Sequence, residues 1–68
     1  MEAQKMVHEA NQIALFFSSY PHDEALAGVV NHFKMFWPPP MRSQIQAYAA
    51  AGGAGLHRLA AEAARQLG

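Results

Sequence analysis

Three consecutive prolines, Pro38 to Pro40, lie just past the midpoint of this 68-residue chain. Proline lacks a backbone N–H, and its ring clashes with the preceding helical turn, so a helix cannot continue through such a run. Each residue that precedes a proline is also pushed into extended backbone geometry. The run therefore predicts a short, rigid corner between two helical parts of the chain.

Apolar residues recur at helical spacing on both sides of the prolines, and no strand-like alternation competes with this pattern. Pro21 suits a first helical turn, and Gly52-Gly53 suits a helix C-terminus. We therefore predict an all-α fold, a small bundle of three to four short helices with a Pro-Pro-Pro corner, in one domain over residues 1–68. The helices are expected over residues 3–18, 21–37, 41–51 and 55–67, give or take a residue or two.

The segment 21–37 carries the bulkiest apolar stripe of the chain and is the expected centre of the core. Gly28 lies off this stripe. Because glycine costs a helix roughly 1 kcal/mol relative to alanine, its presence indicates that another part of the molecule approaches the backbone closely there. The members of the stripe are Leu26, Val29, Val30, Phe33, Phe36 and Trp37.

The core available to this chain is small. Apolar residues make up 51% of the sequence, but 14 of them are alanines, and alanine fills little volume. Burial of apolar surface is worth ~100 kcal/mol for a chain of this mass, and ordering its backbone and side chains costs ~100 kcal/mol. Since these terms cancel and the chain has no Cys for a disulfide, we expect a marginally stable module that needs a partner.

Charge and hydropathy argue against two classes of partner. Five basic and five acidic residues give a net charge of zero with His neutral, which offers no electrostatic footprint for nucleic-acid phosphates. No apolar stretch approaches the length that spans a bilayer, and the N-terminus is too polar for a signal peptide. We therefore expect no nucleic acid and no membrane as a partner, and the lack of Cys fits a cytoplasmic location.

Residue types that could carry chemistry are present, but their spacing does not favour a reactive site. The chain contains four histidines, His8, His22, His32 and His57. No two of them stand three or four residues apart, as two metal ligands on one helix face would. Gly52 to Gly55 follows a helix and lacks the Lys and Ser/Thr of a phosphate-binding loop. Arg58, Glu62 and Arg65 predict a solvated strip of ion pairs. We therefore predict no catalytic, cofactor-binding or metal-binding residue.

Some large apolar residues fall off the helical stripes, on a chain too small to cover both sides of its helices. Surplus apolar surface of this kind usually marks a protein interface, in which aromatic and Arg side chains are enriched. For Trp37 a purely structural place in the core stays open. The predicted partner-binding residues are Leu15, Phe16, Met35, Phe36, Trp37, Met41 and Arg42.

Short fragments spread over residues 11–56 resemble one known family. In chain order they are Asn11-Gln12-Ile13-Ala14, Phe16-Phe17, Tyr20-Pro21, Ala25, Val29 to His32, Phe36-Trp37, Pro39, Met41-Arg42 and Gly52-Gly53-Ala54-Gly55-Leu56. Their order and spacing resemble the small delta subunit of the cytosolic, NAD-dependent, molybdenum-containing formate dehydrogenases. The chain departs from the family pattern at Phe33, at Pro38 and Pro40, and at His57-Arg58.

This resemblance implies a non-catalytic subunit of a cytoplasmic complex that oxidises formate to carbon dioxide and reduces NAD. It implies that the alpha subunit holds the molybdenum pterin and iron–sulfur clusters, that other subunits hold FMN and further clusters, and that this chain holds no cofactor. The delta subunit would dock its spare apolar surface on a larger subunit, with the catalytic alpha subunit favoured, and would support assembly or stability.

Two other functions fit the same residues. A chaperone for maturation of the catalytic subunit, or for insertion of its molybdenum cofactor, would use the same helices but bind only transiently. A free-standing homo-oligomeric regulator, for example of DNA, would need a basic recognition helix. The last two predicted helices offer only Arg42, Arg58 and Arg65, offset by Glu62, so this function ranks last.

Overall fold

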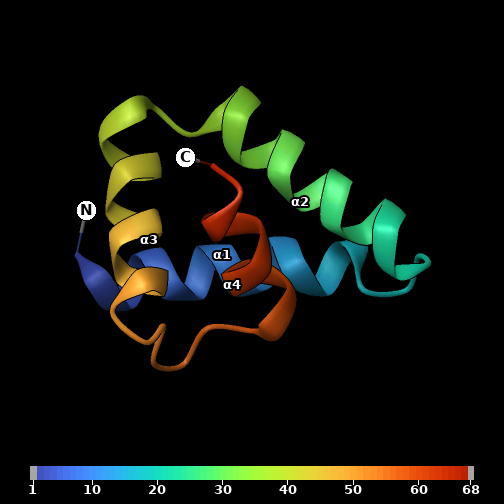
Figure 1. The fold of residues 1–68 in the computed structure, drawn as a ribbon, viewed down its shortest axis with the longest axis horizontal. Helices are drawn as coiled ribbons and strands as arrows, with labels where there is room; N and C mark the ends of the chain where they lie inside the picture. Colours follow the sequence, from blue (N-terminus) through green and yellow to red (C-terminus); the bar gives the residue numbers. More distant parts are fainter. Residues whose placement is uncertain (1, 68) are drawn as a thin grey trace.

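A computed structural model describes residues 2–67 of the chain and shows four helices joined by short turns, with no strand among these residues (Figure 1). The all-α prediction is confirmed, and the corner between the second and third helices lies at the prolines. The helices are α1 (Ala3–Phe17), α2 (His22–Phe36), α3 (Pro39–Ala50) and α4 (Arg58–Arg65).

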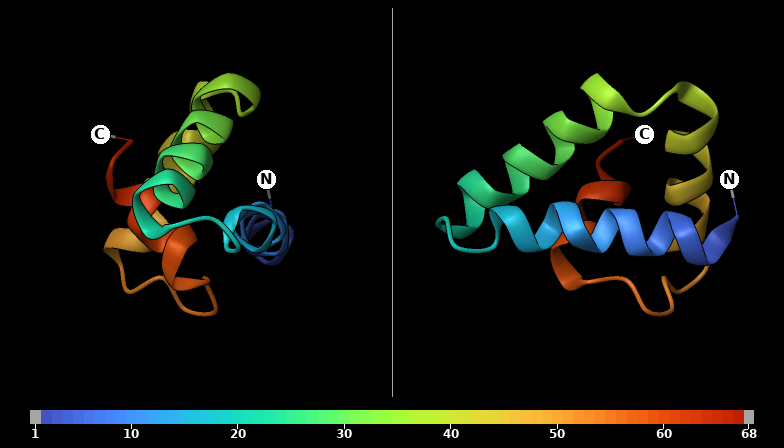
Figure 2. Two further views of the ribbon diagram at one scale, coloured as in Figure 1. Left: turned by 90° about the vertical axis from the view of Figure 1, so that its right-hand side faces the viewer. Right: turned by 180° about the vertical axis from the view of Figure 1, so that it is seen from behind.

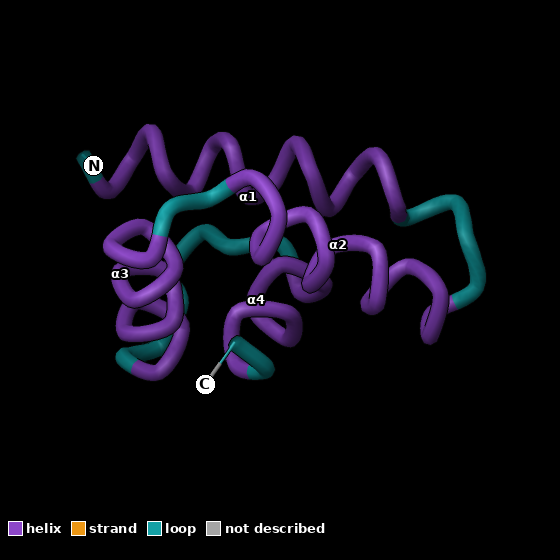
Figure 3. Tube along the Cα trace, turned by 90° about the horizontal axis from the view of Figure 1, so that it is seen from above, coloured by secondary structure: helices purple, strands orange, loops and turns teal. Residues whose placement is uncertain are grey.

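The first two helices form a V that opens away from the turn between them (Figure 1, and from behind in Figure 2). α3 stands at the open end of this V, next to the first turns of α1. The short α4 contacts each of the other three helices. It lies within the opening of the V in Figure 1, and at the edge of the molecule opposite α1 in Figure 3.

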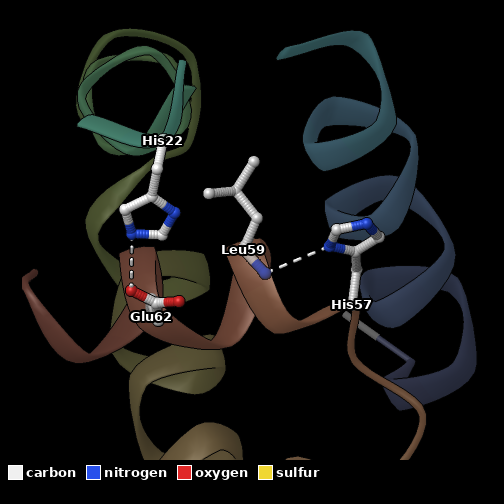
Figure 4. Close-up of polar contacts among 4 residues, drawn as sticks. All are labelled: His22, His57, Leu59 and Glu62. Carbon is white, nitrogen blue, oxygen red and sulfur yellow. Dashed lines mark hydrogen bonds and ion pairs between the residues drawn. The ribbon is translucent and has the colours of Figure 1, made fainter. Parts of the chain in front are cut away.

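The later two helices begin at other residues than the sequence predicted. α3 begins at Pro39, inside the proline run, because the fixed φ of proline suits a first helical turn, where its missing N–H is not needed. α4 begins at Arg58 instead of Gly55, since Gly55 has a φ of 79°. His57 then caps α4, and its Nδ1 accepts a hydrogen bond of 3.0 Å from the Leu59 backbone N–H (Figure 4).

Three helices contribute the large side chains of the core, and the fourth contributes mainly small ones. The largest fully buried side chains are Phe33, Met6, Ile45 and Val29, from α2, α1, α3 and α2. α4 buries Leu59 together with three alanines. Since alanine has no side chain beyond Cβ, the α4 backbone can lie close to three neighbours at once, which explains the alanine-rich end of the chain.

The predicted stripe on α2 is buried as expected except at one residue. Val29, Val30, Phe33 and Trp37 are buried, and Leu26 packs partly buried against them. Phe36 is 66% exposed, so the expectation that it joins the core is wrong. It lies near the C-terminal end of α2, where α1 and α2 have diverged (Figure 1), so α1 does not cover it.

The α3–α4 loop is tied down at both of its ends. The Gly53 N–H donates to the Tyr48 carbonyl over 2.9 Å, and the Gly52 N–H donates to the Ala49 carbonyl over 3.2 Å, which confirms the predicted glycine cap. The Asn11 side chain of α1 donates to the Gly55 carbonyl over 2.9 Å and accepts from the His57 N–H over 2.8 Å. Asn11 therefore clamps the loop onto α1.

The predicted strip of ion pairs on α4 forms differently. Arg58 and Arg65 are exposed, but Glu62 lies 3.3 Å from the Nε2 of His22 on α2, and this contact is the ion pair that Glu62 makes among the described residues (Figure 4). The pair links the start of α2 to α4. Because the His22 side chain is largely exposed, the pair contributes little to stability.

Candidate docking surface

The exposed large apolar side chains lie on α1, on α2 and in the turn between them. Four of the predicted partner-binding residues belong to this set, whereas Tyr20, in the α1–α2 turn, is a member that the sequence reasoning missed. Tyr20 stands between Ser19 and Pro21 in a turn, so it is not part of a helical pattern of apolar residues that could have indicated its exposure. The set consists of Leu15, Phe16, Tyr20, Met35 and Phe36.

Ring contacts join aromatic residues of this surface into two groups, one at the end of α1 and one on α2. The Phe16 ring meets the Phe17 ring edge to face, with centroids 5.1 Å apart, and Phe17 lies 6.1 Å from Tyr20. On α2 the His32 imidazole packs on the Phe36 ring at 4.7 Å. We call these five residues the aromatic patch.

A hollow of about 310 Å³ lies between the α1 part and the α2 part of this patch. We call it the α1–α2 hollow. Ile13, Phe16 and Phe17 line it with carbon, while Gln12 and His32 add an amide and an imidazole. Leu15 and Met35 are exposed but are not among the residues that line it. The exposed apolar residues of the sequence prediction therefore separate into Phe16 and Phe36, which belong to the patch, and two that lie outside it.

Gly28 sets the place where α1 and α2 touch. A Cβ atom built on Gly28 would lie 2.5 Å from two atoms of the Phe17 ring, far closer than real contacts allow. The close approach to the Gly28 backbone that the sequence predicted is confirmed, and the Phe17 side chain makes it. Phe17 also lines the α1–α2 hollow, so the side chain that contacts Gly28 forms part of the wall of the hollow.

Gly28→Ala is expected to destabilise the chain by up to about 2 kcal/mol, since overpacking against the Phe17 ring outweighs the better helix propensity of alanine. In a Phe17→Leu background, where the ring is gone, the same substitution is expected to stabilise by about 0.5–1 kcal/mol. Urea unfolding followed by circular dichroism measures both changes. Equal stabilisation in the two backgrounds would show that Phe17 does not limit this site.

Three other predicted partner-binding residues lie at the proline corner and make contacts within the chain. Trp37 is only 6% exposed, and its ring packs 4.6 Å from that of Phe33, so the structure gives it the core position that the sequence left open. Met41 packs partly buried against the core. The half-buried Arg42 donates from Nη1 to the Lys34 carbonyl over 3.1 Å. Arg42 thus fastens α3 to the last turn of α2.

Two of the histidines line the same hollow but make different contacts there. His57 uses Nδ1 to cap α4, and His22 uses Nε2 to meet Glu62 on the other side of a hollow of about 230 Å³. Within residues 2–67 no three His, Asp or Glu side chains are arranged to hold a metal ion. No helix in the described part of the chain has the length and hydropathy that would let it cross a bilayer.

Comparison with models of known protein families gives a match over most of the chain. The model of the family described as NADH-dependent formate dehydrogenase delta subunit FdsD matches residues 5–64. The match includes nearly all of α1 and α4, all of α2 and α3, and every residue of the aromatic patch. No curated protein and no solved structure matches the chain.

Proposed function

Since the chain belongs to the family of formate dehydrogenase delta subunits, we propose that it is a non-catalytic accessory subunit that docks on a larger subunit and supports assembly or stability. The observation that carries this proposal is the aromatic patch. Phe16 and Phe36 are 68% and 66% exposed. The buried core, by contrast, consists largely of alanines with a few large side chains, so these two rings are large apolar groups left outside it. Exposed aromatic surface of this kind is typical of protein interfaces.

We further propose that the molybdenum pterin, the iron–sulfur clusters and FMN are held by partner subunits, in a cytoplasmic complex. The 68 residues include no Cys, and iron–sulfur clusters are usually ligated by Cys thiolates. The described side chains also gather no set of three metal-binding groups. The described residues therefore offer no ligand set for an iron–sulfur cluster. We propose the catalytic alpha subunit as the docking partner.

The experiment that tests this function is co-purification from cells that express all subunits. The chain is left untagged, and each larger subunit is tagged in turn, so that the tag reports which subunit retains it. A fixed stoichiometry in the mature, cofactor-loaded enzyme supports a permanent subunit. Retention only on enzyme that lacks molybdenum identifies a maturation chaperone. Absence from every tagged subunit, loaded or not, contradicts docking.

Enzyme prepared without the chain is expected to have a lower yield or a lower molybdenum content, while turnover per bound molybdenum stays within about twofold. A subunit that acts through assembly changes how many active sites exist, whereas a group that takes part in the reaction changes the rate at each site. A twofold change is well below the ~1.4 kcal/mol that a tenfold rate difference represents. Formate oxidation, normalised to bound molybdenum, measures it.

Alanine substitution of each histidine serves as the control in fully assembled enzyme. His8, His22, His32 and His57 are the histidines of the chain, and histidine is the residue type that most often serves as a general acid or base in catalysis. Each variant is expected to keep the normalised rate of the parent. A large drop for any one of them would show that this chain takes part in turnover.

A further inference from the structure

We propose that the α1–α2 hollow receives one uncharged, apolar side chain of the larger subunit on which the chain docks. This inference rests on the proposed function and states what chemistry of the partner the docking surface selects. It follows from three properties of the hollow, which are the charge of its lining, the way its walls are held, and the place of the exposed phenylalanines.

The lining is complementary to a group without charge. Ile13, Phe16 and Phe17 offer carbon surface, and no Asp, Glu, Lys or Arg is among the residues that line the hollow. An ionised partner group that entered the hollow would lose its hydration and meet no opposite charge there. An aliphatic or aromatic side chain would instead exchange water for carbon contacts on several sides.

The walls of the hollow are held before any partner arrives. The Phe17 ring is positioned against Gly28, and the Phe16 ring stands at 88° to the Phe17 ring. On the opposite wall the His32 imidazole rests on the Phe36 ring. Because these rings are already supported, less side-chain freedom is lost on binding, which is the property of a pocket that accepts an anchor residue.

The occupant is assigned to a different subunit and not to a second copy of this chain. The chain belongs to a family of delta subunits, which the proposed function places on a larger subunit. A second copy could still offer Leu15, Tyr20 or Met35, and the sedimentation measurement below tests that case. Phe16 and Phe36 already serve the hollow of their own copy, since Phe16 lines it and Phe36 contacts His32. If either ring entered the hollow of a second copy, it would leave its place at the hollow of its own copy and disrupt the wall there.

Substitutions at Gln12 test the proposal, because Gln12 lines the hollow yet is exposed on α1, so that its variants can fold. Gln12→Glu keeps the shape of the side chain and adds a charge, and it is expected to weaken docking at least about tenfold. Gln12→Met keeps the size and adds no charge, and it is expected to bind within about threefold of the parent. Gln4→Glu makes the same charge change on the exposed surface of α1 outside the hollow and is expected to bind like the parent.

Binding is measured by titrating each variant into larger subunits that were prepared without the chain, and sedimentation of each variant alone reports self-association. If Gln12→Glu binds like the parent while Phe16→Ala binds poorly, docking is real but the hollow is not filled by an apolar group. If Gln12→Met is as weak as Gln12→Glu, the partner needs the amide, and the occupant is polar. If the chain dimerises and Gln12→Glu abolishes the dimer, the occupant is a second copy. Each of these three results overturns the inference, whereas failure of the parent itself to bind any larger subunit overturns the proposed function.

Discussion

Trp37→Ala is expected to unfold the isolated chain, whereas Phe36→Ala, one residue earlier, is expected to leave it folded. Trp37 is buried and its ring packs at a tilt against that of Phe33, while Phe36 is mostly exposed. Truncation of a buried Trp to Ala costs about 3–5 kcal/mol, which matches or exceeds the stability expected for a domain of this size. Far-UV circular dichroism and urea titration of the two variants measure the difference.

The same pair separates a core role from a docking role at the proline corner. Phe36→Ala is expected to reduce docking while it keeps its helix content, because it removes the support of the His32 imidazole. If Trp37→Ala stays folded and loses only docking, Trp37 is a docking residue and its core role is contradicted. A Phe36→Ala variant that unfolds would place Phe36 in the core after all.

Phe16→Ala is expected to lose about 2 kcal/mol or more of docking free energy, roughly a thirtyfold loss of affinity. The Phe16 ring is exposed in the isolated chain, lines the α1–α2 hollow and is held by Phe17, which are properties of an interface anchor. Titration into the larger subunits measures the loss, and circular dichroism checks that the variant remains helical.

Leu15→Ala provides a matched control for Phe16→Ala. Leu15 is the preceding residue on the same helix and is also more than half exposed, but it does not line the hollow. Its truncation is expected to cost less than about 0.5 kcal/mol of docking free energy, as for an energetically neutral interface residue. Losses of equal size at both positions would mean that the docking surface extends around α1 and is not centred on the hollow.

Local rules predicted most of the fold from the sequence. Helical periodicity located all four helices, the prolines located the corner, and Gly52-Gly53 located the end of α3. Gly28 also predicted where two helices touch. Glycine destabilises a helix, so its presence in mid-helix indicates that a neighbouring element leaves no room for a Cβ atom. Each of these signals depends on a few adjacent residues, which is why one sequence suffices to find it.

What depends on the angle between helices could not be predicted in this way. Phe36 has the same helical phase as buried residues of α2, but α1 has already moved away at that point, so the phase does not decide its burial. The partnership of Glu62 with His22 instead of an Arg on α4 likewise needs the place of α2 over α4. The hollow itself joins Phe16 to His32 across two helices, and no spacing along the chain encodes that juxtaposition.

The contacts of α4 have a consequence for the order in which the molecule folds. α4 contacts all three other helices and supplies Leu59 and three alanines to the core, yet it is the last of them to be synthesised. A nascent chain that ends before Arg58 keeps the contact between α1 and α2, including Phe17 on Gly28, but lacks the helix on which α3 makes most of its contacts. The placement of α3 therefore waits for the final helix, whereas the phenylalanines of the docking surface lie on the two helices that are made first.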